Sequence, residues 1–167
     1  MTQYFQLFRL PEQFSIDNQI LEQTYRALAT QFHPDKFAAA SAFEQKQAMM
    51  MSATINQAYQ VLKNPLERAV YLLQAQNINP DDPNNTHIAP EFLMQQMQWR
   101  EMLMEARIEN DTHTIQQLHT EITAKREDLL GCLKTYFDEK RYIEAAETVR
   151  QGRFLDKMLH EIETALG

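Results

Sequence analysis

The distribution of proline constrains the fold of this chain more than any other feature of its sequence. Three of the six prolines lie between residues 80 and 90, whereas none occurs from Glu91 to Gly167. Proline interrupts a helix because its ring removes a backbone donor and clashes with the preceding turn. The chain has only 3 glycines and 3 valines beside 9 methionines, a composition that favours helices over strands. The sequence therefore predicts an all-α protein of two parts, divided at this proline cluster.

The part before the proline cluster has the pattern of a helical hairpin. Apolar residues recur at helical spacing on both sides of Pro34, and proline disfavours helical geometry in the residue before it. Ser41, with Glu44 three residues later, predicts the start of a second long helix through a capping box. Asn64 before Pro65 predicts the start of a short third helix. Two antiparallel helices on either side of a loop are therefore expected.

The part after the proline cluster carries three apolar stripes at helical spacing, separated by turn signals near Asn110 and Asp138. The stripes are Phe92, Trp99, Leu103 and Ala106; then Ile115, Leu118, Ile122, Leu129, Leu133 and Tyr136; and finally Ala146, Val149, Leu159, Ile162 and Leu166. Short connections between such helices predict an antiparallel three-helix bundle. The expected organisation is an N-terminal domain over residues 1–76, a linker over 77–90 and a three-helix domain over 91–167.

Charge and hydropathy exclude several classes of partner. The net charge is −7, and residues 1–76 hold six basic and six acidic side chains of the totals of 16 and 23, so the acidic excess lies in the second part. Nucleic-acid binding is not expected, because it depends on lysine and arginine displacing counterions from phosphates. No apolar run approaches the ~18 residues that a membrane helix needs, and the N-terminus lacks the features of a targeting segment. A cytoplasmic protein without membrane contact is expected.

The sequence contains no signature of catalysis or of a bound cofactor. It lacks the glycine-rich, zinc-protease and serine-hydrolase motifs, and its one cysteine excludes an internal disulfide and a CxxC zinc site. His113, His119 and His160 are not spaced to chelate a metal on one helix face, so we expect them at the surface. Cys132 adjoins Leu133 of an apolar stripe and is expected to be a buried packing residue. No enzyme activity, metal or cofactor is predicted.

The loop between the paired helices reads His33, Pro34, Asp35, Lys36. A catalytic function for His33 and Asp35 lacks a nearby nucleophile or ligand set, and a purely structural function would be to end the helix. The segments TYRALATQFHPDKF and ATINQAYQVLKNPLERAVYLL, however, strongly resemble a J-domain. The resemblance implies that His33, Pro34 and Asp35, with Arg26 and Lys36, dock on a DnaK-type chaperone and trigger ATP hydrolysis there. J-domains usually have a more basic helix before this loop, where this chain has only Arg26.

A narrower resemblance extends over nearly the whole chain. The segments YFQLFRLP in the first part and FLMQQMQWRE and ETVRQGRFLDK in the second are similar to the HscB family of co-chaperones of bacterial iron-sulfur cluster assembly. This resemblance implies that the chain binds the scaffold protein IscU, presents it to the specialised chaperone HscA and stimulates the ATPase of HscA. The alternative is a general J-domain co-chaperone for unfolded clients, and a more distant one is a small hydrolase that uses His33 and Asp35.

The first helix of the expected bundle is apolar on two sides. One explanation is that this helix contacts two neighbours, and the other is that methionines mixed with carboxylates form an exposed protein-binding surface. The resemblance favours the second explanation. The scaffold-binding patch is then expected to comprise Leu93, Met94, Met97, Gln98, Glu101, Glu105 and Phe154. Gln98 stands where HscB-like sequences tend to carry an acid.

Overall fold

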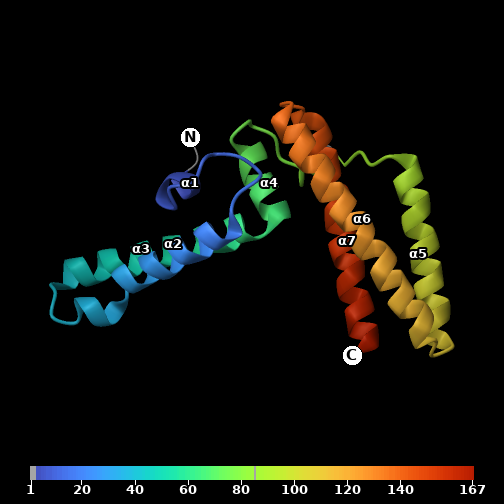
Figure 1. Cartoon of the computed structure of the whole chain (residues 1–167), viewed down its shortest axis with the longest axis horizontal. Coiled ribbons are helices and arrows are strands. Elements are labelled where there is room, and N and C mark those ends of the chain that lie inside the picture. The colour runs from blue at the N-terminus through green and yellow to red at the C-terminus, as the bar shows by residue number, and fades with distance from the viewer. Residues whose placement is uncertain (1–2, 85) are drawn as a thin grey trace. The chain divides into compact units, whose positions relative to one another are not determined.

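The computed structural model describes residues 3–84 and 86–167 (Figure 1). Met1, Thr2 and Asn85, which the expected N-terminal domain and linker include, lie outside the described residues. Every regular element of the described residues is helical, which confirms the all-α prediction. The elements are α1 (Gln3–Leu7), α2 (Asn18–Gln31), the 3-10 helix η1 (Pro34–Phe37), α3 (Ala42–Lys63), α4 (Pro65–Gln74), α5 (Pro90–Ile108), α6 (Thr112–Asp138) and α7 (Tyr142–Leu166). The chain divides into two compact units, Met1–Ala75 and Gln76–Gly167.

The first unit is built on α2 and α3, which lie side by side and are joined through η1 (Figure 1). α2 begins after Asp17, whose carboxylate accepts hydrogen bonds from two backbone N–H groups of the first turn, at 2.9 and 3.3 Å. It ends at Gln31, before Pro34, as the sequence predicts. The apolar residues that these two helices bury are Leu21, Ala48, Ile55, Ala58 and Leu62.

The starts of α3 and α4 follow the predicted capping signals. The Ser41 hydroxyl accepts a hydrogen bond from the backbone N–H of Glu44 at 3.2 Å. The Asn64 side chain accepts from two backbone N–H groups of α4, at 2.9 and 3.3 Å, and Pro65 is the first residue of that helix. Side chains local in sequence therefore fix where both helices begin.

α1 is a feature that the sequence pattern did not predict. Its Phe5 and the following Phe8 are buried, and the ring of Tyr4 stacks on Tyr71 of α4 with the ring centroids 4.6 Å apart. The Tyr71 hydroxyl accepts a hydrogen bond from the backbone N–H of Tyr4 at 3.1 Å, and burial raises the pKa of Tyr71. Because α1 has only five residues, its stability comes from this packing rather than from helix propensity.

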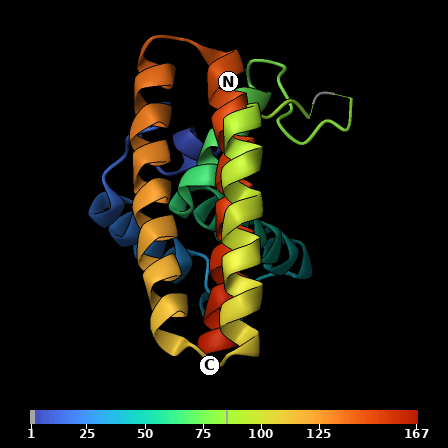
Figure 2. The ribbon, with the colours of Figure 1, turned by 90° about the vertical axis from the view of Figure 1, so that its right-hand side faces the viewer.

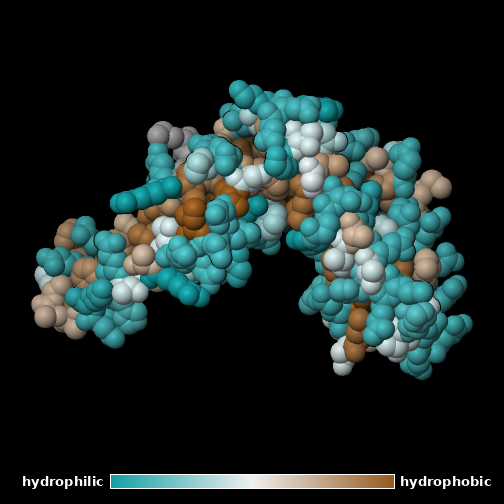
Figure 3. Space-filling view, in the orientation of Figure 1, coloured by the Kyte–Doolittle hydropathy of each residue, from teal (hydrophilic) through white to brown (hydrophobic). Residues whose placement is uncertain are grey.

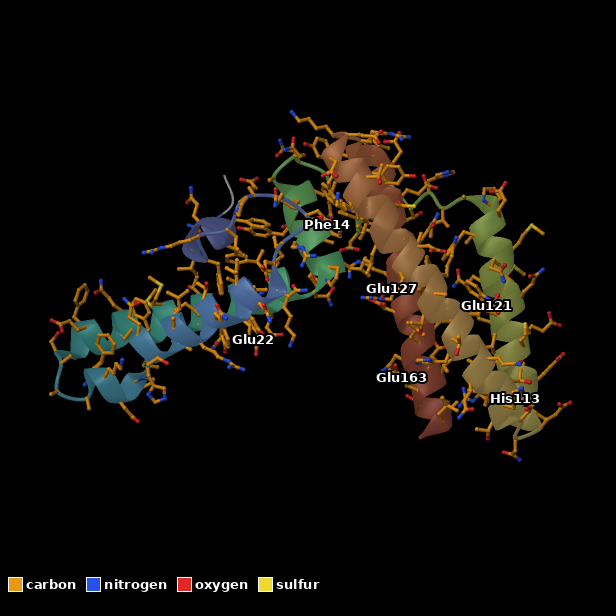
Figure 4. All side chains as sticks on the ribbon, in the orientation of Figure 1. Phe14, Glu22, His113, Glu121, Glu127 and Glu163 are labelled. Atoms are coloured by element: carbon orange, nitrogen blue, oxygen red, sulfur yellow. The ribbon has the colours of Figure 1, made fainter. Side chains whose placement is uncertain are left out.

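Arg68 of α4 is a buried cation in the first unit. Its Nε and Nη1 donate hydrogen bonds to the backbone oxygens of Phe14 and Leu62, each at 2.6 Å. The guanidinium also lies 4.9 Å from the centre of the Phe14 ring, beside α4 in Figure 4. Burial lowers the pKa of Arg68 to about 10. This side chain fastens the segment between α1 and α2 to the end of α3.

The second unit is a bundle of the three long helices α5, α6 and α7, which lie side by side (Figure 2). The turns between them fall at residues 109–111 and 139–141, where the sequence predicts them. Residues of the predicted stripes that form its core are Phe92, Trp99, Leu103, Ala106, Ile115, Leu118, Ile122, Leu129 and Ile162. Leu166 was expected in the stripe of the third helix but is exposed, because it is the last residue of α7.

Cys132 is exposed, so the prediction that it is a buried packing residue is wrong. Successive residues on an α-helix are about 100° apart, and Cys132 therefore lies off the stripe although Leu133 beside it is buried. His113 and His160 are exposed, as expected, whereas His119 is partly buried with its Nε2 3.5 Å from Oε1 of Glu163. Helical phase is therefore stronger evidence for burial than adjacency in sequence.

The proline-rich segment between α4 and α5 is tied to α7. Arg150, which is buried, donates from Nε to the backbone oxygen of Pro80 at 3.0 Å and from Nη1 to that of His87 at 3.1 Å. Arg153 donates from Nη2 to the Asp81 carboxylate at 2.9 Å. These contacts make the segment part of the second unit, although its composition is that of a linker.

Candidate docking surfaces

The loop between α2 and α3 presents His33, Pro34 and Asp35 to solvent. All three residues are exposed, and the Asp35 side chain is 93% exposed. The backbone N–H of Asp35 donates a hydrogen bond to Nδ1 of His33 at 3.2 Å, which makes His33 the N-cap of η1. Pro34 begins η1 at no cost in hydrogen bonds, because the first turn of a helix leaves its N–H groups unpaired. The loop therefore holds the imidazole in place and leaves the carboxylate in water.

Contacts between α2 and α3 fix the position of this loop. The Tyr25 hydroxyl donates a hydrogen bond to the Asn56 side chain at 2.8 Å, and the Tyr25 ring stacks on Tyr59 with the centroids 4.0 Å apart. Lys63 places its Nζ 5.6 Å from the centre of the Tyr59 ring. A hairpin joined by such pairs presents its tip as a rigid feature.

The positive charge near the loop is small. Lys36 is exposed within η1, and Arg26 is exposed on α2. Nη2 of Arg26 lies 2.6 Å from Oε1 of Glu22, one turn earlier on the outer side of α2 (Figure 4). An exposed pair of this kind adds only about 0.3–0.5 kcal/mol to a helix. Its main consequence is that part of the charge expected to attract a partner is already paired.

The outer side of α5 carries most of the expected scaffold-binding residues. Leu93, Met94 and Met97 are exposed, and Met97 is 70% exposed. We define the α5 patch as Leu93, Met94, Met97, Gln98, Glu101 and Glu105, all of which are exposed. Figure 3 shows tan and teal atoms intermixed over α5. This exposure excludes the alternative in which the apolar members of the patch fill the bundle, because the core side of α5 is formed by other residues.

Phe154 differs from the residues of the α5 patch. It lies on α7, is partly buried and packs against the core of the bundle. Its ring is tilted against that of Phe92 with the centroids 6.5 Å apart. Phe154 therefore contributes to the packing of the core, and only part of its side chain is available to a partner.

Two further apolar residues extend the α5 patch toward the end of the helix. Met104 and Ile108 are exposed and follow Met97 at intervals of seven and eleven residues, which keeps them near one side of the helix. The sequence shows this spacing, but the expected patch omits both residues. The exposed apolar surface of α5 is thus longer than the set that the resemblance implies.

Comparisons with known proteins assign both units to one family. Residues 3–72 match the family model for the DnaJ domain, and residues 88–163 match the model described as the HSCB C-terminal oligomerisation domain. Over 166 residues the chain is 60% identical to a co-chaperone protein HscB homolog from Neisseria meningitidis, a match that covers 99% of this chain and 100% of the relative. The chain belongs to the HscB family. A further HscB homolog, from Bordetella petrii, is 43% identical over 97% of this chain and 95% of its own length.

Solved HscB structures have the same fold. HscB from Vibrio cholerae is 37% identical and superposes with a TM-score of 0.86, covering 96% of this chain and 95% of that one. Human HscB is 26% identical with a TM-score of 0.87, covering 97% of this chain and 81% of that one. An HscB chain with a J-domain implies a partner of the Hsp70 type.

Within residues 3–84 and 86–167, no helix combines the length and the hydropathy that crossing a bilayer requires. The same residues contain no cluster of three or more His, Cys, Asp or Glu side chains placed to hold a metal ion.

Proposed function

We propose that this HscB-family chain is an adaptor that couples a client to an ATP-driven chaperone without catalytic turnover of its own. In this proposal it binds the iron-sulfur scaffold IscU, delivers it to HscA and stimulates ATP hydrolysis by HscA during cluster assembly and transfer in the cytoplasm. The observation that carries the proposal is the presence, in one chain of this family, of an exposed J-domain loop and an exposed apolar surface on the other unit.

The loop is proposed to be the surface that meets HscA. The Asp35 carboxylate is almost fully in water, and its own backbone N–H holds the neighbouring imidazole of His33. A carboxylate in this setting is available for charge-assisted hydrogen bonds to a cationic group on the chaperone. Arg26 and Lys36 are proposed to contribute through their charge, with Arg26 weakened by its pair with Glu22.

The α5 patch is proposed to be the surface that holds IscU, and Phe154 is proposed to border it. Leu93, Met94 and Met97 supply apolar area, and methionine adapts its shape to a partner because its side chain is unbranched and flexible. Glu101 and Glu105 supply negative charge along the same helix. Gln98 lies among these residues as a neutral member and is proposed to contribute least.

We also propose that residues 1–76 and 91–167 are separate functional domains and that residues 77–90 join them. The contacts of Arg150 and Arg153 with this joining segment support a view in which it is an ordered part of the second unit rather than a free tether. Any separation between the domains would then begin near Ala75, where the compact units meet in sequence.

Purified IscU and HscA provide the test of the proposed function. The ATPase rate of HscA is measured as this chain is titrated, with and without IscU. Stimulation by the chain, increased further by IscU, is the expected result, whereas no stimulation would contradict the proposal. Recovery of mixed unfolded polypeptides instead of IscU in a pull-down would favour the general J-domain co-chaperone.

A further inference from the structure

The first unit has an exposed apolar groove that none of the surfaces described above includes. The groove has a volume of about 1060 Å³ and lies among α1, the end of α2, η1 and the first half of α3. Its apolar lining includes Leu7, Phe32, Phe37, Phe43, Met50 and Met51. Phe43 is 68% exposed and Met50 is 62% exposed, an uncommon degree of exposure for large apolar side chains that lie together. In Figure 3, tan atoms gather at the end of the first unit where η1 leads into α3.

The lining of the groove includes the residues on either side of the J-domain loop. Phe32 is the residue before His33, and Phe37 is the last residue of η1, so the loop is bounded in sequence by two residues of the groove wall. A protein that docks on His33 and Asp35 therefore meets the groove at the edge of the same contact. The Hsp70-type chaperone is the partner that the J-domain implies for this loop.

The wall of the groove is held in place by a side chain of α3. Nε2 of Gln45 donates hydrogen bonds to the backbone oxygens of Phe37 and Ala38, at 3.1 and 3.3 Å. These bonds fasten the end of η1 to the first turn of α3. A surface that is already ordered loses less conformational entropy when a partner binds.

Charge near the loop favours an apolar contribution to docking. Among the described residues, the only charged side chains in the lining of the groove are Glu44 and Lys46, which are opposite in sign, so the charge of Asp35 and Lys36 is confined to the loop beside it. Attraction by charge is therefore weak on this side of the first unit, whereas apolar area is plentiful. A chaperone that contacts this face gains more from burying Phe43 and Met50 than from ion pairs.

We propose that this groove is a second docking site for the Hsp70-type chaperone, in which an apolar segment of the chaperone lies beside the contact made by the loop. The proposal rests on the proposed function, because it takes the chaperone as the partner of the first unit. The loop triggers hydrolysis, and the groove contributes affinity.

Substitutions in α3 test the groove against a matched control. Phe43→Ser and Met50→Gln, alone and together, remove apolar area from the groove, whereas Met49→Gln makes the same kind of change outside it. Met49 is 65% exposed but does not line the groove. We expect the double variant to raise the concentration that gives half-maximal ATPase stimulation of HscA by about fivefold or more, with the maximal stimulation retained and Met49→Gln unchanged. An unchanged half-maximal concentration in the double variant would overturn the proposal.

Asp35→Asn, measured in the same experiment, separates failure of the groove from failure of the proposed function. If Asp35→Asn abolishes stimulation and the double variant behaves as wild type, only the groove proposal falls. If Asp35→Asn stimulates fully, the proposed function itself falls.

A crosslinking experiment identifies the occupant without depending on affinity. A photo-crosslinking amino acid is placed at residue 43 or, as the control, at residue 49, and the full chain is irradiated with HscA and ATP. Crosslinks to HscA from residue 43, and few from residue 49, support the proposal. Crosslinks from residue 43 to a second copy of this chain, or to added unfolded polypeptide in preference to HscA, would contradict it.

Discussion

The loop at the tip of the first unit and the α5 patch of the second are both exposed, but they differ in nearly every physical respect. The loop is small and polar, and its shape is fixed by the hydrogen bond between the Asp35 backbone and His33. The α5 patch is long and mixes apolar with polar side chains, and its flexible members Met94, Met97, Glu101 and Glu105 are all exposed to water. A small rigid polar feature suits a trigger, whereas a broad adaptable one suits affinity for a folded client.

Because of this difference, we expect the two surfaces to respond differently to substitution. At the loop the charge of the Asp35 carboxylate lies at a defined point. Exchanging one of its oxygens for nitrogen, as in Asp35→Asn, is therefore expected to remove stimulation of the chaperone. At the α5 patch several exposed apolar side chains lie side by side, so we expect a large effect only when the central ones, each a potential hot spot, are removed together. Substitutions at the loop and at the α5 patch should therefore have separable effects on chaperone stimulation and on IscU binding.

The largest effect is expected at the loop. Asp35→Asn keeps the size of the side chain and the backbone hydrogen bond but removes the charge, and it should reduce stimulation of HscA to the basal rate. His33→Gln, which removes the imidazole that caps η1, should have the same result. Steady-state ATPase assays measure the effect, with circular dichroism and IscU affinity as controls that stay at wild-type values. Full stimulation by both variants would show that the loop is not the trigger.

The next largest effect is expected at the α5 patch. The double change Leu93→Ser and Met97→Ser removes two exposed apolar contacts, each potentially worth ~2 kcal/mol at the centre of an interface. IscU binding should weaken well over tenfold, since ~1.4 kcal/mol corresponds to tenfold. Calorimetry measures the affinity, and stimulation of HscA without IscU should be unchanged.

Neighbouring variants sharpen the prediction for the α5 patch. Gln98→Ala should change IscU affinity little, because the side chain is neutral and exposed, whereas Glu101→Ala should weaken it measurably. Equal losses for both would mean that charge on this helix contributes nothing to recognition.

A smaller effect, on stability, should separate Phe154 from the α5 patch. Phe154→Ala removes a ring that packs on Phe92 and the core, so it should lower the free energy of unfolding by about 2 kcal/mol, less than the ~3–5 kcal/mol of a fully buried phenylalanine. Leu93→Ser, at an exposed position, should stay within about 0.5 kcal/mol of wild type. Urea denaturation measures both, and equal stabilities would place Phe154 outside the core.

The smallest effect is expected for the cations beside the loop. Lys36→Ala should weaken HscA stimulation a few-fold at low salt, and Arg26→Ala should weaken it less because Arg26 is paired with Glu22. Both differences should shrink as salt increases, since exposed charges are screened over about 10 Å at 0.1 M ionic strength. Titrations at two salt concentrations provide the measurement; a larger loss for Arg26→Ala would show that the pair opens on docking.

The fold could be predicted from sequence where the determinants are local. Pro34, the caps at Ser41 and Asn64, and the apolar stripes of the bundle each act within a few residues, and the helices begin and end accordingly. α1 could not be predicted, because its five residues are held by Tyr71, which is 67 positions away from Tyr4. The buried neighbour Leu133 wrongly predicts burial of Cys132, because burial on a helix follows helical phase rather than adjacency in sequence.

The sequence predicts the residues of the loop completely, but it predicts those of the α5 patch only in part. The loop is a contiguous motif, so His33, Pro34 and Asp35 were identifiable at once. The α5 patch required knowing which side of a helix that is apolar on two sides faces the core, and sequence alone left that open. The apolar groove was not predictable, because it combines residues of α1, η1 and α3 that no single periodicity relates.

The most direct test of the account is an ATPase measurement with two separable variants. HscA is titrated with wild type, Asp35→Asn, and the double variant Leu93→Ser with Met97→Ser, each with and without IscU. We expect Asp35→Asn to bind IscU normally but never to stimulate HscA, and we expect the double variant to stimulate HscA alone normally but to lose the additional stimulation caused by IscU. Loss of both activities in either variant, with an unchanged melting temperature, would contradict the division of function between the loop and the α5 patch.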